Sequence, residues 1–197
     1  FMRREGNPGR AEITEITQTF VRERGLNPIG LAGFQNRYAL AMRRERAEEL
    51  GVVSVQDLAP LASMLSAGGD LEFFGRSEWK RLQSLYDLDF ARELTFDAAL
   101  MYTAVEAGQV DVISAYSTDG RVAAYDLVLL EDPRQALLSY DAMLLASSAA
   151  AQEPRFTAAP APGPGANSDE AMRQANKNRI LNQTETAQHT THGDPGG

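Results

Sequence analysis

Residues 95–116 read Thr95-Phe-Asp-Ala-Ala-Leu-Met-Tyr-Thr-Ala-Val-Glu-Ala-Gly-Gln-Val-Asp-Val-Ile-Ser-Ala-Tyr116. The first part predicts a helix over Phe96–Ala107, because Thr95 suits an N-cap and Gly108 suits a helix stop. The second part, Val110–Tyr116, is rich in β-branched and aromatic residues and predicts a strand. A helix that leads directly into a strand is the repeating unit of an α/β fold with a largely parallel sheet.

The same alternation extends in both directions along the chain. Apolar spacing and capping residues predict helices over Ala11–Arg24, Tyr38–Leu50 and Glu78–Tyr86, and one more after the capping pair Ser54 and Asp57. Strands are predicted over Leu71–Phe74, Tyr125–Leu130 and Met143–Ala146. The fold class predicted from these elements is α/β.

Composition narrows the function classes. The 197 residues include no cysteine, and both histidines, His189 and His192, lie in the last nine residues. A disulfide framework, a thiolate metal site and a Ser-His-Asp triad are therefore excluded from the rest of the chain. The net charge is −8, and residues 51–150 carry 15 acidic and 6 basic side chains. Such an acidic body does not suit nucleic acid, so we expect a binding protein that is not an enzyme and needs no metal ion or cofactor.

The composition changes near residue 147. Residues 148–197 contain Pro/Gly-rich and Gln/Thr-rich stretches with few large apolar side chains, so we expect a largely irregular tail. One helix is predicted inside it, from the N-cap Ser168 to about Arg179. The sequence contains no run of about 18 consecutive apolar residues, the length that would indicate a membrane span.

Two polar side chains stand at predicted strand ends, where ligands of open α/β sheets gather. Arg76 follows the strand predicted at Leu71–Phe74, and Tyr116 ends the strand that begins at Val110. A guanidinium binds a carboxylate, and a tyrosine face attracts a quaternary ammonium, so the pair suits a zwitterion that carries both groups.

Each candidate also has an ordinary structural interpretation. Arg76 could pair with Glu72 or Glu78 on the surface, and Tyr116 could simply end its strand. Tyr38 and Tyr140 could be packing residues, and the sequence Ser117-Thr-Asp-Gly120 could be only a turn.

The order of the motifs is more specific than any one of them. The series runs Gly33-Phe-Gln-Asn-Arg-Tyr-Ala-Leu-Ala-Met42, Val55-Gln-Asp-Leu-Ala59, Glu72-Phe-Phe-Gly-Arg76, Leu100-Met-Tyr-Thr-Ala104, Gly108-Gln-Val-Asp-Val112, Ala115-Tyr-Ser-Thr-Asp-Gly120 and Leu129-Leu-Glu-Asp-Pro133. This series resembles the substrate-binding proteins of osmoprotectant ABC importers, the glycine betaine/carnitine/choline-binding family. The similarity covers about Leu26 to Ala146 and is greatest with the permease-fused branch.

The resemblance implies a type II periplasmic-binding-protein-like α/β fold, in which two lobes close over the ligand and tyrosines enclose its trimethylammonium group. It implies that Tyr38, Tyr116 and Tyr140 are walls of that box and that Arg76 holds a betaine carboxylate. Asn36 and Asp119 belong to the same motifs, and we expect them to shape the loops of the ligand site.

The resemblance also implies a domain division. Residues 1–33 are expected to be a remnant of the first lobe, residues 34–116 a nearly complete second lobe, and residues 117–147 the return to the first lobe. The crossovers near residues 30–36 and 116–120 would form the hinge. The family's Tyr-Thr-Gly-Thr motif does not precede Phe1, so the first lobe is expected to be N-terminally truncated. Arg37 also departs from the family, where a small hydroxyl residue is usual.

The implied function is ligand binding for an importer. The implied partners are a small quaternary-ammonium compound and an ABC permease, fused or separate, with the chain on the periplasmic or extracytoplasmic side of the membrane and associated with it. Two alternatives stay open. The chain could be the effector-binding domain of a regulator, although no basic helix-turn-helix segment is present, or a fragment that no longer binds ligand.

Overall fold

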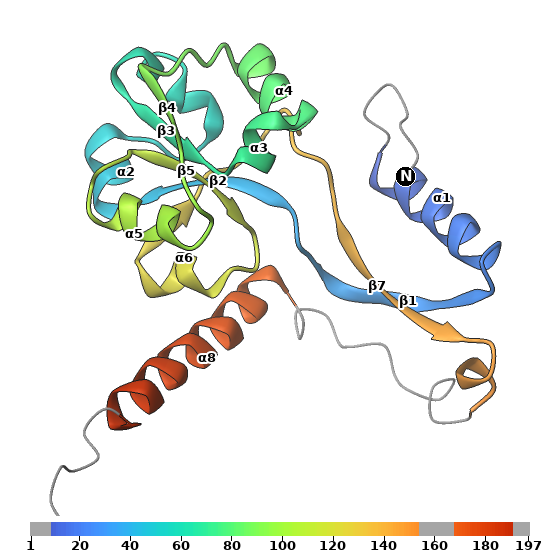
Figure 1. Cartoon of the computed structure of the whole chain (residues 1–197). Helices are drawn as coiled ribbons and strands as arrows, with labels where there is room; N and C mark the ends of the chain where they lie inside the picture. Colours follow the sequence, from blue (N-terminus) through green and yellow to red (C-terminus); the bar gives the residue numbers. More distant parts are fainter. Residues whose placement is uncertain (1–8, 154–167, 191–197) are drawn as a thin grey trace, which may run out of the picture.

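The computed structural model describes residues 9–153 and 168–190 (Figure 1). The longer helices are α1 (Arg10–Arg22), α2 (Arg44–Leu50), α4 (Ser77–Tyr86), α5 (Leu100–Glu106) and α8 (Asp169–Thr190). The short helices are α3 (Leu71–Gly75) and α6 (Gly120–Ala124), with single 3-10 turns at Val55–Leu58, Ala62–Met64 and Ala150–Gln152. The strands are β1 (Leu26–Gln35), β2 (Tyr38–Arg43), β3 (Ser66–Gly69), β4 (Arg92–Thr95), β5 (Val112–Tyr116), β6 (Leu127–Leu129) and β7 (Asp141–Ser147).

A five-stranded mixed sheet forms the centre of the molecule, with strand order β4-β3-β5-β2-β6. Strands β4, β3 and β5 are parallel, whereas β2 runs antiparallel to both β5 and β6. Strand β6 therefore runs in the same direction as β4, β3 and β5, and the prediction of a largely parallel sheet holds for four of the five strands. The exception is β2, which enters the sheet directly after β1 and points against its neighbours.

Helices cover both faces of this sheet, and each face has its own apolar core. One core packs the alternate β2 residues Leu40 and Met42 against Trp79 and Leu82 of α4. The other core packs the residues of α5 and α6 against the opposite side of the sheet, where Ile113 of β5 is fully buried. This layered arrangement is the one expected of an α/β domain.

Strands β1 and β7 pair with each other in a separate antiparallel ribbon. Figure 1 shows the two strands leaving the five-stranded sheet together, with α1 beside their far half. The end of the ribbon nearest the sheet is closed by a 3.0 Å hydrogen bond from the Asn36 N–H to the Tyr140 carbonyl. The chain therefore passes between the five-stranded sheet and the ribbon near residues 35 and 140. From the sequence, the second crossover is instead expected near residues 116–120.

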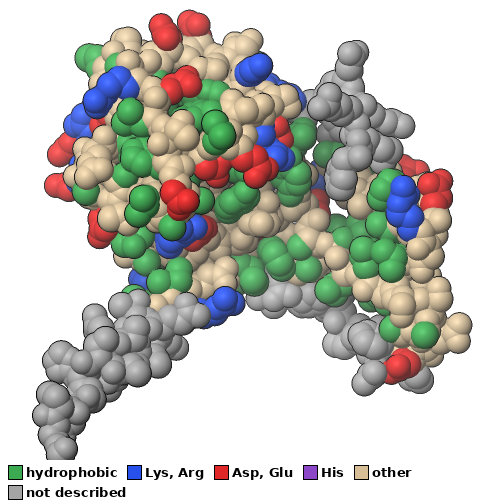
Figure 2. All heavy atoms as spheres, in the orientation of Figure 1, with side chains coloured by type: hydrophobic (Ala, Val, Ile, Leu, Met, Phe, Trp, Pro, Cys, Tyr) green, Lys and Arg blue, Asp and Glu red, His purple; other side chains and the backbone are tan. Residues whose placement is uncertain are grey.

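The ribbon exposes apolar surface. Five of its large side chains are at least one-third exposed: Leu26, Ile29, Leu31, Leu144 and Leu145. Figure 2 shows hydrophobic side chains on the part of the molecule where Figure 1 places the ribbon and α1. Leu26–Gln35 contains no charged residue, so this strand lacks the charges that commonly keep an exposed edge strand from pairing with other chains.

Two element predictions are wrong because buried context overrides local composition. Residues 38–43, predicted as the start of a helix, form β2, whose first five residues are all buried between β5 and β6. Residues 71–74, predicted as a strand, lie in α3, where the Asp70 carboxylate caps the helix by accepting a 2.7 Å hydrogen bond from the Phe73 N–H. The helix predicted from Thr95 begins only at Leu100, because Thr95 ends β4.

The other element predictions are confirmed within a few residues, except that the helix predicted after Ser54 is only a single 3-10 turn, Val55–Leu58. Helix α4 matches its prediction, and the carboxylate of Asp57 accepts a 2.8 Å hydrogen bond from the Ser54 N–H, as expected of a capping pair. In the tail, Ser168 caps α8 through a 3.1 Å hydrogen bond from the Ala171 N–H. Helix α8 is longer than predicted and continues to Thr190, so the tail is less irregular than expected. Residues 154–167, also expected to be irregular, lie outside the described residues.

The domain division by sequence differs from the sheet topology. Strand β6 pairs with β2, so residues 117–130 lie with the five-stranded sheet and not with the ribbon. The sequence had assigned residues 117–147 to the return toward a first lobe. In the structure the chain leaves the sheet only after the loop that precedes β7.

Candidate functional site

Two tyrosines predicted for the site lie side by side at one edge of the sheet. Tyr38 begins β2 and Tyr116 ends β5, and the antiparallel register places them directly opposite each other. Opposed residues of paired strands share a face, so the two rings meet, with their centroids 4.6 Å apart. The Tyr116 hydroxyl donates a 2.8 Å hydrogen bond to the Tyr38 hydroxyl.

The contact between Tyr38 and Tyr116 limits which faces of the two rings are accessible to a cation. A cation held between two rings needs a ring separation of roughly 10 Å, twice a cation–π distance. The Tyr38 and Tyr116 rings are too close for that, and together they make one wall of a site. Tyr38 is only 5% exposed, and burial raises its pKa, with a further increase from the hydrogen bond to Tyr116.

Arg76 lies on the same side of the sheet, between α3 and α4. Its guanidinium carbon is 5.2 Å from the centroid of the Tyr38 ring. The guanidinium also pairs with the carboxylates of Glu72, at 2.6 Å, and Glu78, at 3.6 Å. Both ion pairs of the ordinary interpretation are thus formed, and the Arg76 guanidinium also lies over the Tyr38 ring.

Tyr140 joins this group through Glu78. The Tyr140 hydroxyl donates a 2.8 Å hydrogen bond to Oε1 of Glu78. Glu78 is 7% exposed, and its burial acts to raise its pKa. The hydrogen bond from Tyr140 and the charge of Arg76 outweigh burial, and the pKa of Glu78 is lowered overall. The buried carboxylate thus remains ionised at neutral pH.

Asn36 and Asp119 hold the turn that follows Tyr116. The Asn36 side chain accepts a 2.8 Å hydrogen bond from the Thr118 hydroxyl. Asp119 caps α6 through the Arg121 N–H and forms a 2.6 Å ion pair with the Arg121 side chain. Burial acts to raise the pKa of Asp119, but its bonds to Arg121 lower it overall. Both side chains therefore hold this loop through hydrogen bonds.

A cavity of about 400 Å³ opens beside Tyr116, within the usual range of about 300–1,000 Å³ for small-molecule sites. Its lining joins the residues around the turn to one side of α8: Asn36, Tyr116, Thr118, Asp119, Gly120, Arg121, Asn176, Arg179 and Ile180. Three of the six predicted site residues therefore line this cavity.

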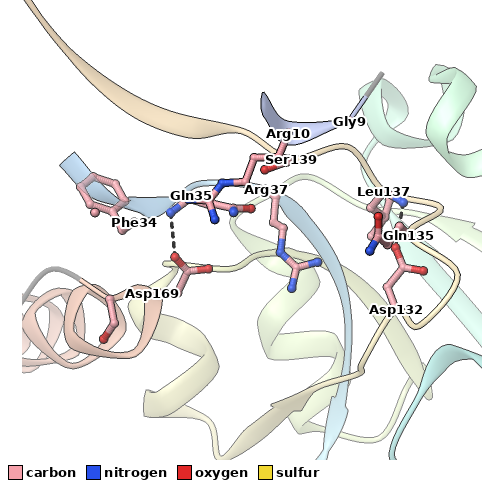
Figure 3. A pocket seen from close by; sticks show the side chains of 12 residues that line it. Gly9, Arg10, Phe34, Gln35, Arg37, Asp132, Gln135, Leu137, Ser139 and Asp169 are labelled. Carbon is pink, nitrogen blue, oxygen red and sulfur yellow. Dashed lines mark hydrogen bonds between the residues drawn. The ribbon is translucent and has the colours of Figure 1, made fainter. Parts of the chain in front are cut away.

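A second cavity, of about 620 Å³, lies where the ribbon meets the loop before β7 and the start of α8 (Figure 3). Arg37 extends into the space between Asp169 and Asp132. The Ser117 N–H donates a 2.8 Å hydrogen bond to the Arg37 carbonyl. The side chain that departs from the family pattern thus points into a cavity at the base of the ribbon.

The sequence missed two parts of the site. Glu78 was considered only as a surface partner of Arg76, although it is buried and bonded to Tyr140. Phe73 was read as part of a strand, but its ring lies 5.1 Å from that of Tyr38 and supports the tyrosine wall from behind. The signal available for Glu78 was its position in the first turn of a predicted helix, two residues after the candidate Arg76.

No group of three or more carboxylate and imidazole side chains is placed to hold a metal ion within residues 9–153 and 168–190. In the same ranges, no helix has both the length and the apolar character required to cross a membrane.

Comparison with known proteins gives consistent results. Residues 14–189 match the family model for the substrate binding domain of ABC-type glycine betaine transport systems. The carnitine transport binding protein OpuCC of Listeria monocytogenes is 34% identical over 117 residues, which are 58% of this chain and 38% of that protein. The ergothioneine transport permease and binding protein EgtU of Helicobacter pylori is 27% identical over 134 residues, 68% of this chain and 24% of that protein. The chain thus spans well under half the length of these relatives.

A solved structure described as a glycine betaine/carnitine/choline ABC transporter superposes with a TM-score of 0.81. It is 27% identical, and the superposition covers 91% of this chain and 67% of the other. The predicted fold class, an α/β architecture of the type II periplasmic-binding-protein kind, is confirmed. The matched family consists of transport proteins and not of enzymes. The match spans most of the sequence, and the chain belongs to the family of substrate-binding domains of ABC-type glycine betaine transport systems.

Proposed function

We propose that this chain binds a quaternary-ammonium compound (glycine betaine, carnitine or choline) for an osmoprotectant ABC importer. The observation that supports the proposal most directly is the stack of Arg76 on Tyr38, with Tyr116 alongside. The Tyr116 ring, packed against Tyr38, supplies an electron-rich face for a trimethylammonium group, and the guanidinium supplies a partner for a carboxylate. Both halves of a betaine are thereby recognised at one edge of the sheet.

The geometry suggests where each ligand group binds. Because Tyr38 and Tyr116 touch, the ammonium group packs on the accessible side of Tyr116, which lines the 400 Å³ cavity. The ligand carboxylate takes the place of the Glu72 carboxylate on Arg76. That exchange is feasible because the Glu72 side chain is 69% exposed and can turn into solvent.

The ribbon is the proposed hinge. Pairing of β1 with β7 is interrupted between Pro28 and Gly30 and again between Leu31 and Gln35. Strands bend most easily at such irregularities. In this proposal the sheet with its helices is the ligand-binding lobe, and residues 1–33 with the far part of β7 belong to the other lobe. Closure of the lobes would add further walls to the site.

The proposed partner is an ABC permease, which would receive the ligand from this chain on the extracytoplasmic side of the membrane. The relative from Helicobacter pylori, whose name joins a permease and a binding protein, supports a close association of the two functions. Any membrane association is proposed to occur through the permease or an anchor.

Saturation-transfer NMR with millimolar glycine betaine tests the proposal, because this experiment detects weak binding. We expect transfer to the ligand methyl protons and loss of this transfer in Tyr116→Ala. Affinity is expected in the millimolar range, because the described residues offer one aromatic wall and not a closed box. Transfer that persists unchanged in Tyr116→Ala, or no transfer at all, would contradict the proposed function, and a micromolar affinity would contradict the one-wall geometry.

A further inference from the structure

Helix α8 packs against the segment that carries Tyr116. Figure 1 shows α8 lying beneath α6, although more than 40 residues separate the two helices in the sequence. At Gly120, a Cβ atom would lie 2.4 Å from the backbone nitrogen of Lys177 and 2.5 Å from the carbonyl carbon of Asn176. No Cβ atom tolerates such distances, so the two backbones meet only because residue 120 is glycine.

Two side chains of α8 bind the turn directly after Tyr116. The Arg173 guanidinium donates a 2.6 Å hydrogen bond to the Ser117 carbonyl. The Asn176 amide donates a 2.8 Å hydrogen bond to the Thr118 carbonyl. Both carbonyls belong to the two residues that follow Tyr116, so α8 restrains the backbone from which the Tyr116 ring projects.

The first turn of α8 also binds the end of the ribbon. The Asp169 carboxylate accepts a 2.7 Å hydrogen bond from the Gln35 N–H (Figure 3). The Gln35 carbonyl in turn accepts a 2.8 Å hydrogen bond from the Ser117 hydroxyl. Ribbon end, turn and α8 therefore form one closed network of hydrogen bonds around the base of the Tyr116 strand.

We propose that α8 is a positioning element for ligand recognition, and that Asn176 and Gly120 set the position of the Tyr116 ring without contacting its aromatic face. The inference rests on the proposed function for its ligand but not for its geometry. It gives a specific role to a segment whose composition predicted only one short helix in an irregular tail. It also links the site to the hinge, since the same helix holds Gln35.

A fluorine NMR experiment on the full chain tests this inference. The six tyrosines are replaced by 3-fluorotyrosine, and the Tyr116 resonance is assigned by its loss in Tyr116→Phe. The test variant is Asn176→Ala, which removes one hydrogen bond to the turn. The matched control is Asn178→Ala, which changes the same residue type at an exposed position of the same helix. Gly120→Ala is a second, stronger variant that pushes α8 away.

We expect the Tyr116 resonance to shift or broaden in Asn176→Ala and Gly120→Ala and to stay unchanged in Asn178→Ala. Betaine affinity should fall by up to about fivefold in Asn176→Ala and stay unchanged in Asn178→Ala, while the melting temperature of Asn176→Ala falls only by the small amount expected for the loss of one hydrogen bond. A Tyr116 resonance that is unmoved in Asn176→Ala would overturn the inference, even if Gly120→Ala fails to fold. If the unmodified chain shows no betaine binding, the proposed function is wrong. The fluorine spectrum still tests whether α8 sets the position of the Tyr116 ring, because that measurement needs no ligand.

Discussion

The Tyr140 hydroxyl donates a 2.8 Å hydrogen bond to Oε1 of Glu78 and so connects the segment leading into β7 with helix α4. The acceptor is a buried carboxylate with a lowered pKa, and the ordinary value for the unfolded chain is 4.5. A carboxyl group with a lowered pKa stabilises the fold above the unfolded pKa and loses that contribution as the pH falls through the folded pKa. We therefore expect the free energy of unfolding to decrease below pH 4.5.

The variant Glu78→Gln isolates this contribution. It should be less stable than the unmodified chain at neutral pH, with a shallower loss of stability below pH 4.5. Urea unfolding over a pH series measures both effects. Glu106→Gln is the control, because Glu106 is an exposed carboxylate at the end of α5. Identical pH slopes for Glu78→Gln and the unmodified chain would show that the Glu78 carboxylate is not the relevant group.

Removal of Glu72 should strengthen betaine binding. Glu72 occupies the Arg76 guanidinium at 2.6 Å, and a ligand carboxylate must displace it. An exposed ion pair is worth up to about 1 kcal/mol, so Glu72→Gln is expected to increase betaine affinity by up to about fivefold. Choline has no carboxylate, and its affinity should be unchanged. A saturation-transfer titration with each ligand makes the comparison, and an equal change for both would contradict an Arg76–carboxylate contact.

The hydroxyl and the ring of Tyr116 should have separable effects. Tyr116→Phe keeps the ring but removes the donor to Tyr38, at a cost of about 1 kcal/mol in the free energy of unfolding. The cation site depends on the ring, so Tyr116→Phe should keep binding a trimethylammonium ligand while Tyr116→Ala loses it. Thermal unfolding and the NMR titration together test this. Loss of binding in both variants would assign ligand recognition to the hydroxyl.

The cap of α3 should influence the position of Arg76. The Asp70 carboxylate caps the helix through the Phe73 N–H, and the helix carries Phe73 behind the tyrosine wall and leads directly into Arg76. Asp70→Ala should cost about 1 kcal/mol of stability and weaken betaine binding, whereas Asp70→Asn retains a capping oxygen and should have a smaller effect. Urea unfolding and titration of both variants provide the check. Equal losses in the two would point to the charge of Asp70 as the cause.

Elements with a clear local sequence pattern were predicted correctly, and elements without one were not. Helix α4 and strand β5 have regular patterns and were predicted nearly in full. Strand β3, with the sequence Ser66-Ala-Gly-Gly69, has no β-branched residue and was not predicted. Its glycines are required by neighbours distant in sequence, because a Cβ on Gly68 would lie 3.0 Å from the ring of Phe96 and 3.2 Å from Ile113. Close packing of this kind leaves no local pattern.

In the site, too, residues with a local sequence signal were predicted, and a residue that depends on a distant contact was missed. Tyr38, Tyr116 and Arg76 were selected from motif order and strand ends, and the structure brings all three into contact. Glu78 was missed as a site member because its partner Tyr140 lies 62 residues away, and its burial depends on that contact. The wrong assignment of Tyr38 to a helix did not prevent its selection, since its role depends on its position opposite Tyr116 and on no helical property.

The Gly120 contact has a consequence for the tolerance of α8 to substitution. Backbone meets backbone there, so the seam between α6 and α8 makes little use of side-chain shape or hydrophobicity. On α8 itself, the side chains that bind the turn and the ribbon end are Asp169, Arg173 and Asn176, and substitution of these should weaken docking. A Gln- and Asn-rich segment can therefore dock in one orientation through a few polar contacts, provided that the residue facing it across the seam has no side chain.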